Sequence, residues 1–151
     1  MNAYNLHTKN FTFDELVRSS KAIKEGITNE PESINQLVAI CNLMANVLQP
    51  AREKCGFPIT VTSGFRCDRL NKLVSKTANS QHKKGEAADL QCFSGGKFDA
   101  KRTRQLFSVL SEMDVDQLLY EKDSQGSIWV HVSYKSPKEN RHDVRDNYYA
   151  G

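Results

Sequence analysis

Apolar residues recur every three or four positions between residues 33 and 55, and this spacing predicts a long amphipathic helix. Pro31 or Ser33 begins this helix, Pro50 is a point where its last turns can bend, and Cys55-Gly56 ends it. The predicted inward stripe consists of Ile34, Leu37, Val38, Cys41, Met44, Ala45, Leu48 and Ala51.

Three shorter segments also carry helix signals. Thr12 and Glu15 form a capping box before a helix of about two turns, from Phe13 towards Ser20. Asp68 is expected to cap a short helix over residues 69–74. Asp99 is expected to cap a helix over residues 100–113, with Leu106, Val109, Leu110 and Met113 facing inward.

Four segments rich in β-branched or alternating apolar residues predict strands, at 58–63, 87–92, 117–121 and 128–134. The last two are joined by residues 122–127, which contain Gly126 and predict a hairpin. Helices therefore come first, and strands mixed with helices follow. This order predicts an α+β fold, with a small and mostly antiparallel sheet flanked by helices.

The 151 residues are interpreted as one domain, 1–151, in which 136–151 form a polar tail without an assigned structure. No run of 18 apolar residues is present, so membrane insertion is not expected. The N-terminus lacks the apolar segment of a secretory signal. We therefore expect synthesis in the cytoplasm without a signal peptide, followed by release if the target lies outside.

The net charge of +3 is too small to favour nucleic acid as a partner, because nucleic-acid binding calls for a concentrated basic face. It is compatible with mild attraction to an anionic surface such as a cell wall. The four cysteines contain no Cys-x-x-Cys pair, which argues against a structural zinc cluster. Buried thiols are the simpler interpretation, and disulfides formed after release are the alternative.

The segment 80–89 reads Ser-x-His-x-x-Gly-x-Ala-x-Asp and places His82 seven residues before Asp89. On a straight helix the two side chains would be separated by about 10 Å along the axis, and on a strand by about 23 Å. Both can bind one metal ion only if the chain reverses between them. Gly85 is where that turn costs least, because glycine tolerates positive φ. The stretch therefore predicts two metal ligands on either side of a tight turn.

A third candidate ligand is His131, which lies between Val130 and Val132 in the last predicted strand. The two valines face one side, so His131 faces the other, with Trp129 and Ser133. His7 and His142 are far from any motif and are interpreted as surface residues.

These blocks together resemble the zinc D-Ala-D-Ala carboxypeptidase/endopeptidase family, peptidase family M15 of the subfamily A type, in its phage endolysin-like form. The resemblance rests on residues 80–89 and the late Trp129-Val-His131, and it extends to 59–66 and 116–121. It implies a hedgehog/DD-peptidase-like fold and one catalytic Zn²⁺ held by His82, Asp89 and His131. Three protein ligands with an open fourth position are what a catalytic zinc site needs.

The resemblance also implies roles for residues around the ion. Arg66 would stabilise the oxyanion that forms on the substrate carbonyl. Ser80 would bind substrate near the zinc, or it would cap the turn. Trp129 would form a wall of the site or belong to the core.

The catalytic base is where this sequence departs from the family. Many members carry an acidic residue three positions before the last His, and here that position is Ile128. Glu121 is our substitute, because a hairpin turn near residues 125–126 would place it opposite Trp129 or His131. Asp116 and Asp123 are weaker candidates for the same task.

The resemblance implies a zinc metallopeptidase that hydrolyses an amide at or next to D-Ala in peptidoglycan stem peptides or cross-links. A phage or prophage lysis enzyme, acting as a monomer on the cell wall after release, fits the short chain best. The alternatives are a phage virion component or a non-catalytic hedgehog-like zinc-binding module, which the missing acid at position 128 keeps open.

Overall fold

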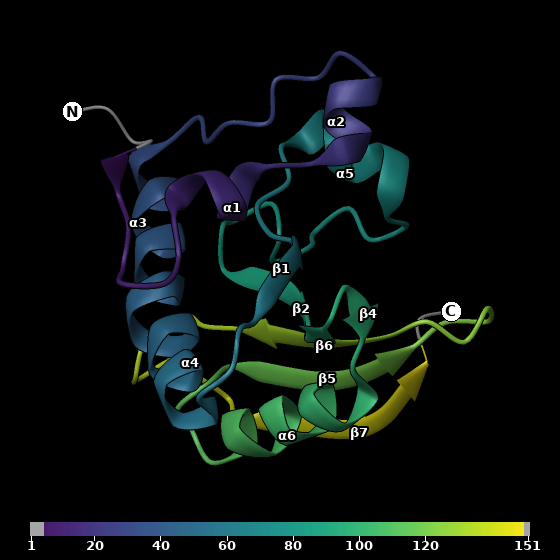
Figure 1. Cartoon of the computed structure of the whole chain (residues 1–151). Coiled ribbons are helices and arrows are strands. Elements are labelled where there is room, and N and C mark those ends of the chain that lie inside the picture. The colour runs from purple at the N-terminus through teal and green to yellow at the C-terminus, as the bar shows by residue number, and fades with distance from the viewer. Residues whose placement is uncertain (1–4, 150–151) are drawn as a thin grey trace.

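A five-stranded sheet in the order β1-β2-β6-β5-β7 forms the centre of the computed structural model, which describes residues 5–149 (Figure 1). Neighbouring strands are antiparallel except for β5 and β7, which run parallel. The predicted α+β fold with a small, mostly antiparallel sheet is confirmed. The strands are β1 (Thr60–Ser63), β2 (Ala87–Gln91), β5 (Gln117–Lys122), β6 (Ile128–Ser133) and β7 (Asp143–Tyr149).

Helices surround this sheet, and α6 packs against its strands β5 and β6. In Figure 1, α3 and α4 stack into one column beside the sheet, and α6 lies across it. A two-stranded hairpin, β3 (Phe93–Ser94) with β4 (Lys97–Phe98), precedes α6 and was not predicted. The helices are α1 (Phe13–Val17), α2 (Ser20–Lys24), α3 (Ile34–Leu43), α4 (Gln49–Cys55), α5 (Asp68–Val74) and α6 (Ala100–Ser111), with a π-helical turn, Met44–Leu48, between α3 and α4.

The two faces of the sheet differ in chemistry. Leu90, Leu118, Val130 and Val132 are fully buried and belong to the hydrophobic core. Residues paired directly across antiparallel strands share a face, so Asp89 lies beside His131 on the opposite side of the sheet. The alternation that hides the valines of β6 therefore presents its histidine away from the core.

The first predicted helix is shorter than expected. The Thr12–Glu15 capping box is present, but α1 ends at Val17, because Arg18 adopts extended backbone angles. Ser19 then caps a separate helix, α2, through a hydrogen bond that its side chain accepts from the Ala22 amide. The prediction of one helix towards Ser20 was wrong.

The long predicted helix is present as one column, in which α3, the π-helical turn and α4 follow one another without a break. Gly56 ends it in a left-handed conformation. Its predicted inward face was partly wrong, because Ile34 and Val38 are 72% and 50% exposed and Ala45 is also exposed. The helix carries apolar residues on more than one side, so their spacing is compatible with two different buried stripes. The π-helical turn also rotates the residues that follow it relative to those before it. The buried stripe consists of Ile40, Leu43, Met44, Val47, Leu48 and Ala51.

The later helices follow their predictions closely. Asp99 caps α6 by accepting a hydrogen bond from the Arg102 amide, and Leu106, Leu110 and Met113 are buried. Asp68 is the first residue of α5 rather than its cap. Its carboxylate forms ion pairs with Lys72 and Lys83 instead.

The segment after β6, expected to be a polar tail, contains a strand. β7 pairs in parallel with β5 along the outer edge of the sheet (Figure 1). Its register shifts between Leu119 and Glu121, where Asn147 has a φ of 57° and marks an irregularity. Residues 150 and 151 lie outside the described part.

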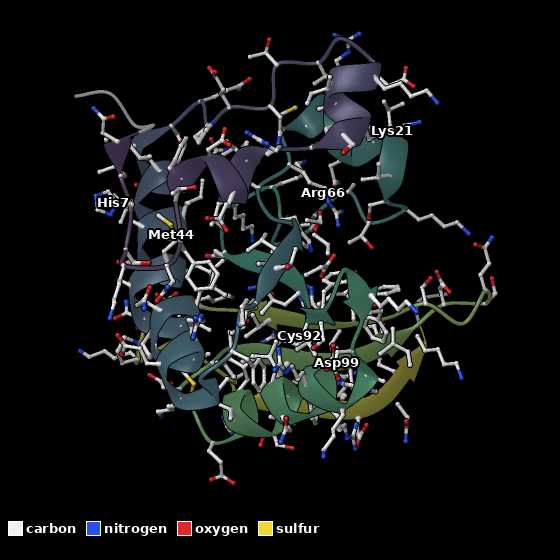
Figure 2. All side chains as sticks on the ribbon, viewed as in Figure 1. His7, Lys21, Met44, Arg66, Cys92 and Asp99 are labelled. Carbon is white, nitrogen blue, oxygen red and sulfur yellow. The ribbon has the colours of Figure 1, made fainter. Side chains whose placement is uncertain are left out.

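All four cysteines are free thiols, and Cys67 and Cys92 are buried. Among the described helices, none is both long and apolar enough to cross a membrane. His7 and His142 are exposed, as predicted, and Figure 2 places His7 beside α3, well away from Arg66.

Candidate metal centre

Three predicted ligands from different segments meet on the face of the sheet that points away from the core. His82 comes from the turn before β2, Asp89 from β2 and His131 from β6. Their candidate ligand atoms all lie within 4.8 Å of one another. Asp89 Oδ1 is 3.0 Å from His131 Nδ1 and 3.4 Å from His82 Nε2. The predicted convergence of the three side chains is confirmed.

The turn that brings His82 to Asp89 depends on Gly85, as the sequence predicts. Gly85 has a φ of +78°, and a Cβ added there would lie 2.6 Å from the Gln36 carbonyl oxygen. The chain reverses through hydrogen bonds from the Lys84 and Glu86 amides to the Gln81 carbonyl. Ala87 and Ala88 are buried directly after the turn. A larger residue at position 85 would therefore displace the segment that carries His82.

The ring orientation of His82 is set by the main chain of the β1–α5 connection. Its Nδ1 lies 2.7 Å from the Gly64 carbonyl oxygen, which can only accept a hydrogen bond. The Nδ1 atom therefore carries a proton, and Nε2 faces Asp89. No sequence signal identified Gly64 as the residue that orients this ligand.

Asp89 carries the charge that a metal ion would need. Burial raises the pKa of Asp89, but the adjacent His82 and His131 imidazoles outweigh it and hold that pKa well below its usual range. The carboxylate is therefore ionised over the physiological pH range.

Arg66 reaches the same cluster from the segment after β1. Its guanidinium lies 3.6 Å from Asp89 and donates hydrogen bonds to Ser63 and to the buried Asn71. Burial lowers the pKa of Arg66, while the charges of Asp89 and Glu121 raise it. Figure 2 shows this side chain in the space between α5 and the sheet. A partly buried, tethered cation beside the cluster can donate to a substrate oxygen without rearranging.

Glu121 lies on the next strand, in the register that the hairpin predicts. It pairs with Trp129, and its carboxylate accepts a hydrogen bond from the Trp129 side chain. Burial, followed by the charge of Asp89, raises the pKa of Glu121. Trp129 is partly exposed, so it forms part of the site wall rather than the core.

The weaker candidates for the base have structural roles. The Asp123 carboxylate accepts hydrogen bonds from the amides of Gln125 and Ser127 and so closes the hairpin. Asp116 is fully buried, and Arg141 and Gln81 donate hydrogen bonds to its carboxylate. Neither carboxylate lines the cavity described next.

A cavity of about 780 Å³ contains the cluster. Its walls include His82, Asp89, His131, Arg66, Glu121, Ser80 and Trp129, so the predicted site residues meet there, except the weaker base candidates Asp116 and Asp123. Ser80 also accepts a hydrogen bond from the His82 amide, which is the turn-capping alternative. Sequence reasoning missed Lys135, Arg141 and Tyr148, which come from the segment after β6 and also line the cavity.

The donor set and its spacing fit one zinc ion. Two atoms bound at about 2.1 Å to a tetrahedral ion lie about 3.4 Å apart. The 3.4 Å between Asp89 Oδ1 and His82 Nε2 equals that value, and the 3.0 Å between Asp89 Oδ1 and His131 Nδ1 is slightly shorter. Two imidazole nitrogens with one carboxylate oxygen are also a typical ligand set for a zinc site that leaves one position open.

Comparison with known protein families agrees with this geometry. A family model described as peptidase M15 matches residues 9–133, which include all three candidate ligands, Arg66 and Glu121. A search of curated proteins found no match. Because the match covers most of the chain, the protein belongs to the peptidase M15 family of zinc-dependent metallopeptidases.

Proposed function

We propose that this protein hydrolyses an amide bond at or next to D-Ala in the stem peptides or cross-links of bacterial peptidoglycan. The observation that carries the proposal is the convergence of His82, Asp89 and His131 with the buried acid Glu121 and the partly buried guanidinium of Arg66 in one cavity. Zn²⁺ held by these three residues would supply a Lewis acid and lower the pKa of water at the site.

Glu121 and Arg66 divide the remaining work in this proposal. Glu121 accepts a proton from the attacking water while the water oxygen bonds to the substrate carbonyl carbon. Arg66 donates to the carbonyl oxygen as negative charge develops on it. The carbon–nitrogen bond then breaks, and the proton passes from Glu121 to the leaving amine. Trp129 orients Glu121 through the hydrogen bond between their side chains.

Glu121 replaces the acid that many family members carry three residues before the last histidine. Ile128 occupies that position here and pairs with Lys122. Residues three apart on a strand face opposite sides, so Ile128 points away from His131. Apart from the ligand Asp89, Glu121 is the one acid among the described residues that line the cavity.

The peptidoglycan target and a role in phage or prophage lysis rest on the sequence resemblance together with the family match. A monomer released onto the cell wall is the simplest form of this proposal. Ser80 would contribute to substrate binding from the cavity wall while it caps the His82 turn.

The test is digestion of purified peptidoglycan by zinc-loaded protein, with mass spectrometry of the released peptides. We expect new amine termini at a D-Ala bond. Glu121→Gln should lower kcat by about 10² to 10⁴-fold while zinc stays bound, because it removes proton transfer alone. Glu139→Gln, an exposed acid outside the cavity, is the control and should match the wild type.

The rival is a non-catalytic zinc-binding module, which the apolar Ile128 favours. Wild-type protein that binds zinc but releases no new amine termini from any wall type would support that rival. Full activity in Glu121→Gln would instead refute Glu121 as the base, and the proposed peptidase activity would still hold.

A further inference from the structure

Part of the cavity wall lies beyond the residues that match the family. The match ends at residue 133, whereas Lys135, Arg141 and Tyr148 line the cavity from the segment that follows. The connection from β6 to β7 passes the start of β5, where the His142 amide bonds to the Val115 carbonyl and the Asp143 amide to the Asp116 carbonyl. We call Lys135, Arg141 and Tyr148 the added wall, because they line the cavity from outside the matched residues.

The added wall is cationic. Lys135 has no ion-pair partner among the described residues, and neither does Lys76 on another part of the cavity rim. The two acids that line the cavity, Asp89 and Glu121, lie at the metal cluster with Arg66. A bound zinc ion would add two further positive charges, so the cavity favours anionic groups of the substrate.

Arg141 is fixed in place and still has a free donor. Its Nε and Nη2 bond the buried Asp116 carboxylate at 3.0 and 2.9 Å, which anchors the side chain. No described residue accepts a hydrogen bond from its Nη1, and the side chain is 52% exposed. An anchored guanidinium with an unused N–H at a cavity wall is suited to binding a carboxylate oxygen.

The distance from the metal cluster limits where that carboxylate can lie. Lys135 follows His131 by four residues, and β6 ends at Ser133, so at most about 13 Å of chain separates the two residues. A peptide bound in extended form spans that length with about four residues. Stem peptides of peptidoglycan carry free carboxylates at their C-terminus and on internal acidic residues within such a length.

We propose that Lys135 and Arg141 form a carboxylate-binding wall that selects substrates with a free carboxylate within about four residues of the scissile amide. This inference rests on the proposed function and names specificity-determining residues for it. The bound group is either the terminal carboxylate or an internal acidic side chain of the peptide.

The test measures binding without turnover, with zinc-loaded Glu121→Gln protein. Trp129 is the chain's one tryptophan and lines the cavity, so its fluorescence reports occupancy. Three synthetic stem peptides ending in D-Ala-D-Ala are titrated: one with all carboxylates free, one amidated at the C-terminus and one amidated at the internal acidic residue. Amidation of the carboxylate that the wall binds should lower the affinity about tenfold. The amidated peptide that loses affinity therefore identifies which carboxylate is bound.

Variants assign the effect to residues. Lys135→Gln should lower the affinity for the peptide with free carboxylates about five- to tenfold. It should leave unchanged the affinity for the peptide amidated at the carboxylate that the wall binds. Lys135→Arg should restore binding. Arg141→Lys, which keeps a cation beside Asp116, should weaken binding in the same selective way. Lys138→Gln is the matched control, because Lys138 is exposed in the same segment and does not line the cavity.

Equal affinity for all three peptides, no detectable binding, or equal effects of Lys135→Gln and Lys138→Gln would overturn the proposal. Peptidase activity of the wild type is measured separately. An inactive wild type would refute the proposed function, whereas the binding selectivity tests the carboxylate wall alone.

Discussion

Two glycines determine the geometry of the metal cluster at the scale of single residues. The Gly64 carbonyl orients His82, and a Cβ at Gly64 would lie 2.3 Å from the Leu16 carbonyl oxygen. Gly85 combines positive φ with close approach to the main chain of α3. Both positions therefore require glycine. At Gly64 the reason is close packing, and at Gly85 it is close packing together with the positive φ.

Gly85→Ala should destabilise the fold by about 3 kcal/mol or more, because it adds a steric clash to the cost of positive φ. Gly126→Ala is the matched control. Gly126 has a φ of +87° but nothing within 4 Å of an added Cβ, so about 1–2 kcal/mol is expected there. Denaturant unfolding measures both, and equal losses would contradict a close contact at Gly85.

At the scale of elements, local signals predicted the parts of the site that depend on short-range geometry. The hairpin between β5 and β6 has the expected register, in which Glu121 pairs with Trp129. The reversal at Gly85 followed from the spacing of His82 and Asp89. A short turn fixes which residues of two adjacent strands face each other, so the sequence contains enough information for this pairing.

The elements that were missed depend on partners distant in the sequence. β7 is mostly polar, Asn147 within it and His142 just before it have positive φ, and it pairs in parallel with β5, so no local pattern marks it. α2 has only five residues and exposes Ile23, so it lacks an apolar stripe. The contact between Arg141 and Asp116 joins segments whose proximity exists only in the folded chain.

Arg141→Ala should destabilise the protein by about 3–5 kcal/mol, because it leaves the buried Asp116 carboxylate without its cation. Arg145→Ala removes an arginine from the same segment whose ion pair with Asp143 is exposed, and it should cost less than about 1 kcal/mol. Thermal or urea unfolding compares the two variants. Similar losses would show that Asp116 does not depend on Arg141.

At the scale of the whole molecule, the sheet separates stability from chemistry. Its apolar face packs against the helices, and its opposite face carries the metal cluster and the cavity. Asp116 connects the two regions, because its carboxylate accepts hydrogen bonds from Gln81 beside the ligand His82 and from Arg141 in the C-terminal segment. Acid that protonates Asp116 should therefore loosen the site together with the fold.

Acid unfolding tests this connection. Burial raises the pKa of Asp116, but hydrogen bonds from Arg141 and Gln81 outweigh it and lower the pKa to about 2. Because this pKa lies below the ordinary value, the stabilisation is complete above about pH 5 and is lost as the pH falls through 2. Between pH 5 and 2 the wild type should lose on the order of 2 kcal/mol more than Asp116→Asn. An identical pH dependence in both proteins would contradict this, and Glu139→Gln serves as the surface control.

The most direct test of the metal centre is anomalous X-ray diffraction at the zinc edge from crystals of the zinc-loaded protein. The predicted result is one peak, about 2.0–2.2 Å from His82 Nε2, an Asp89 carboxylate oxygen and His131 Nδ1. The peak should be absent from crystals of His131→Ala soaked under the same conditions. A zinc peak at the cysteines, or none at these three residues in the wild type, would contradict the assignment of a catalytic zinc site.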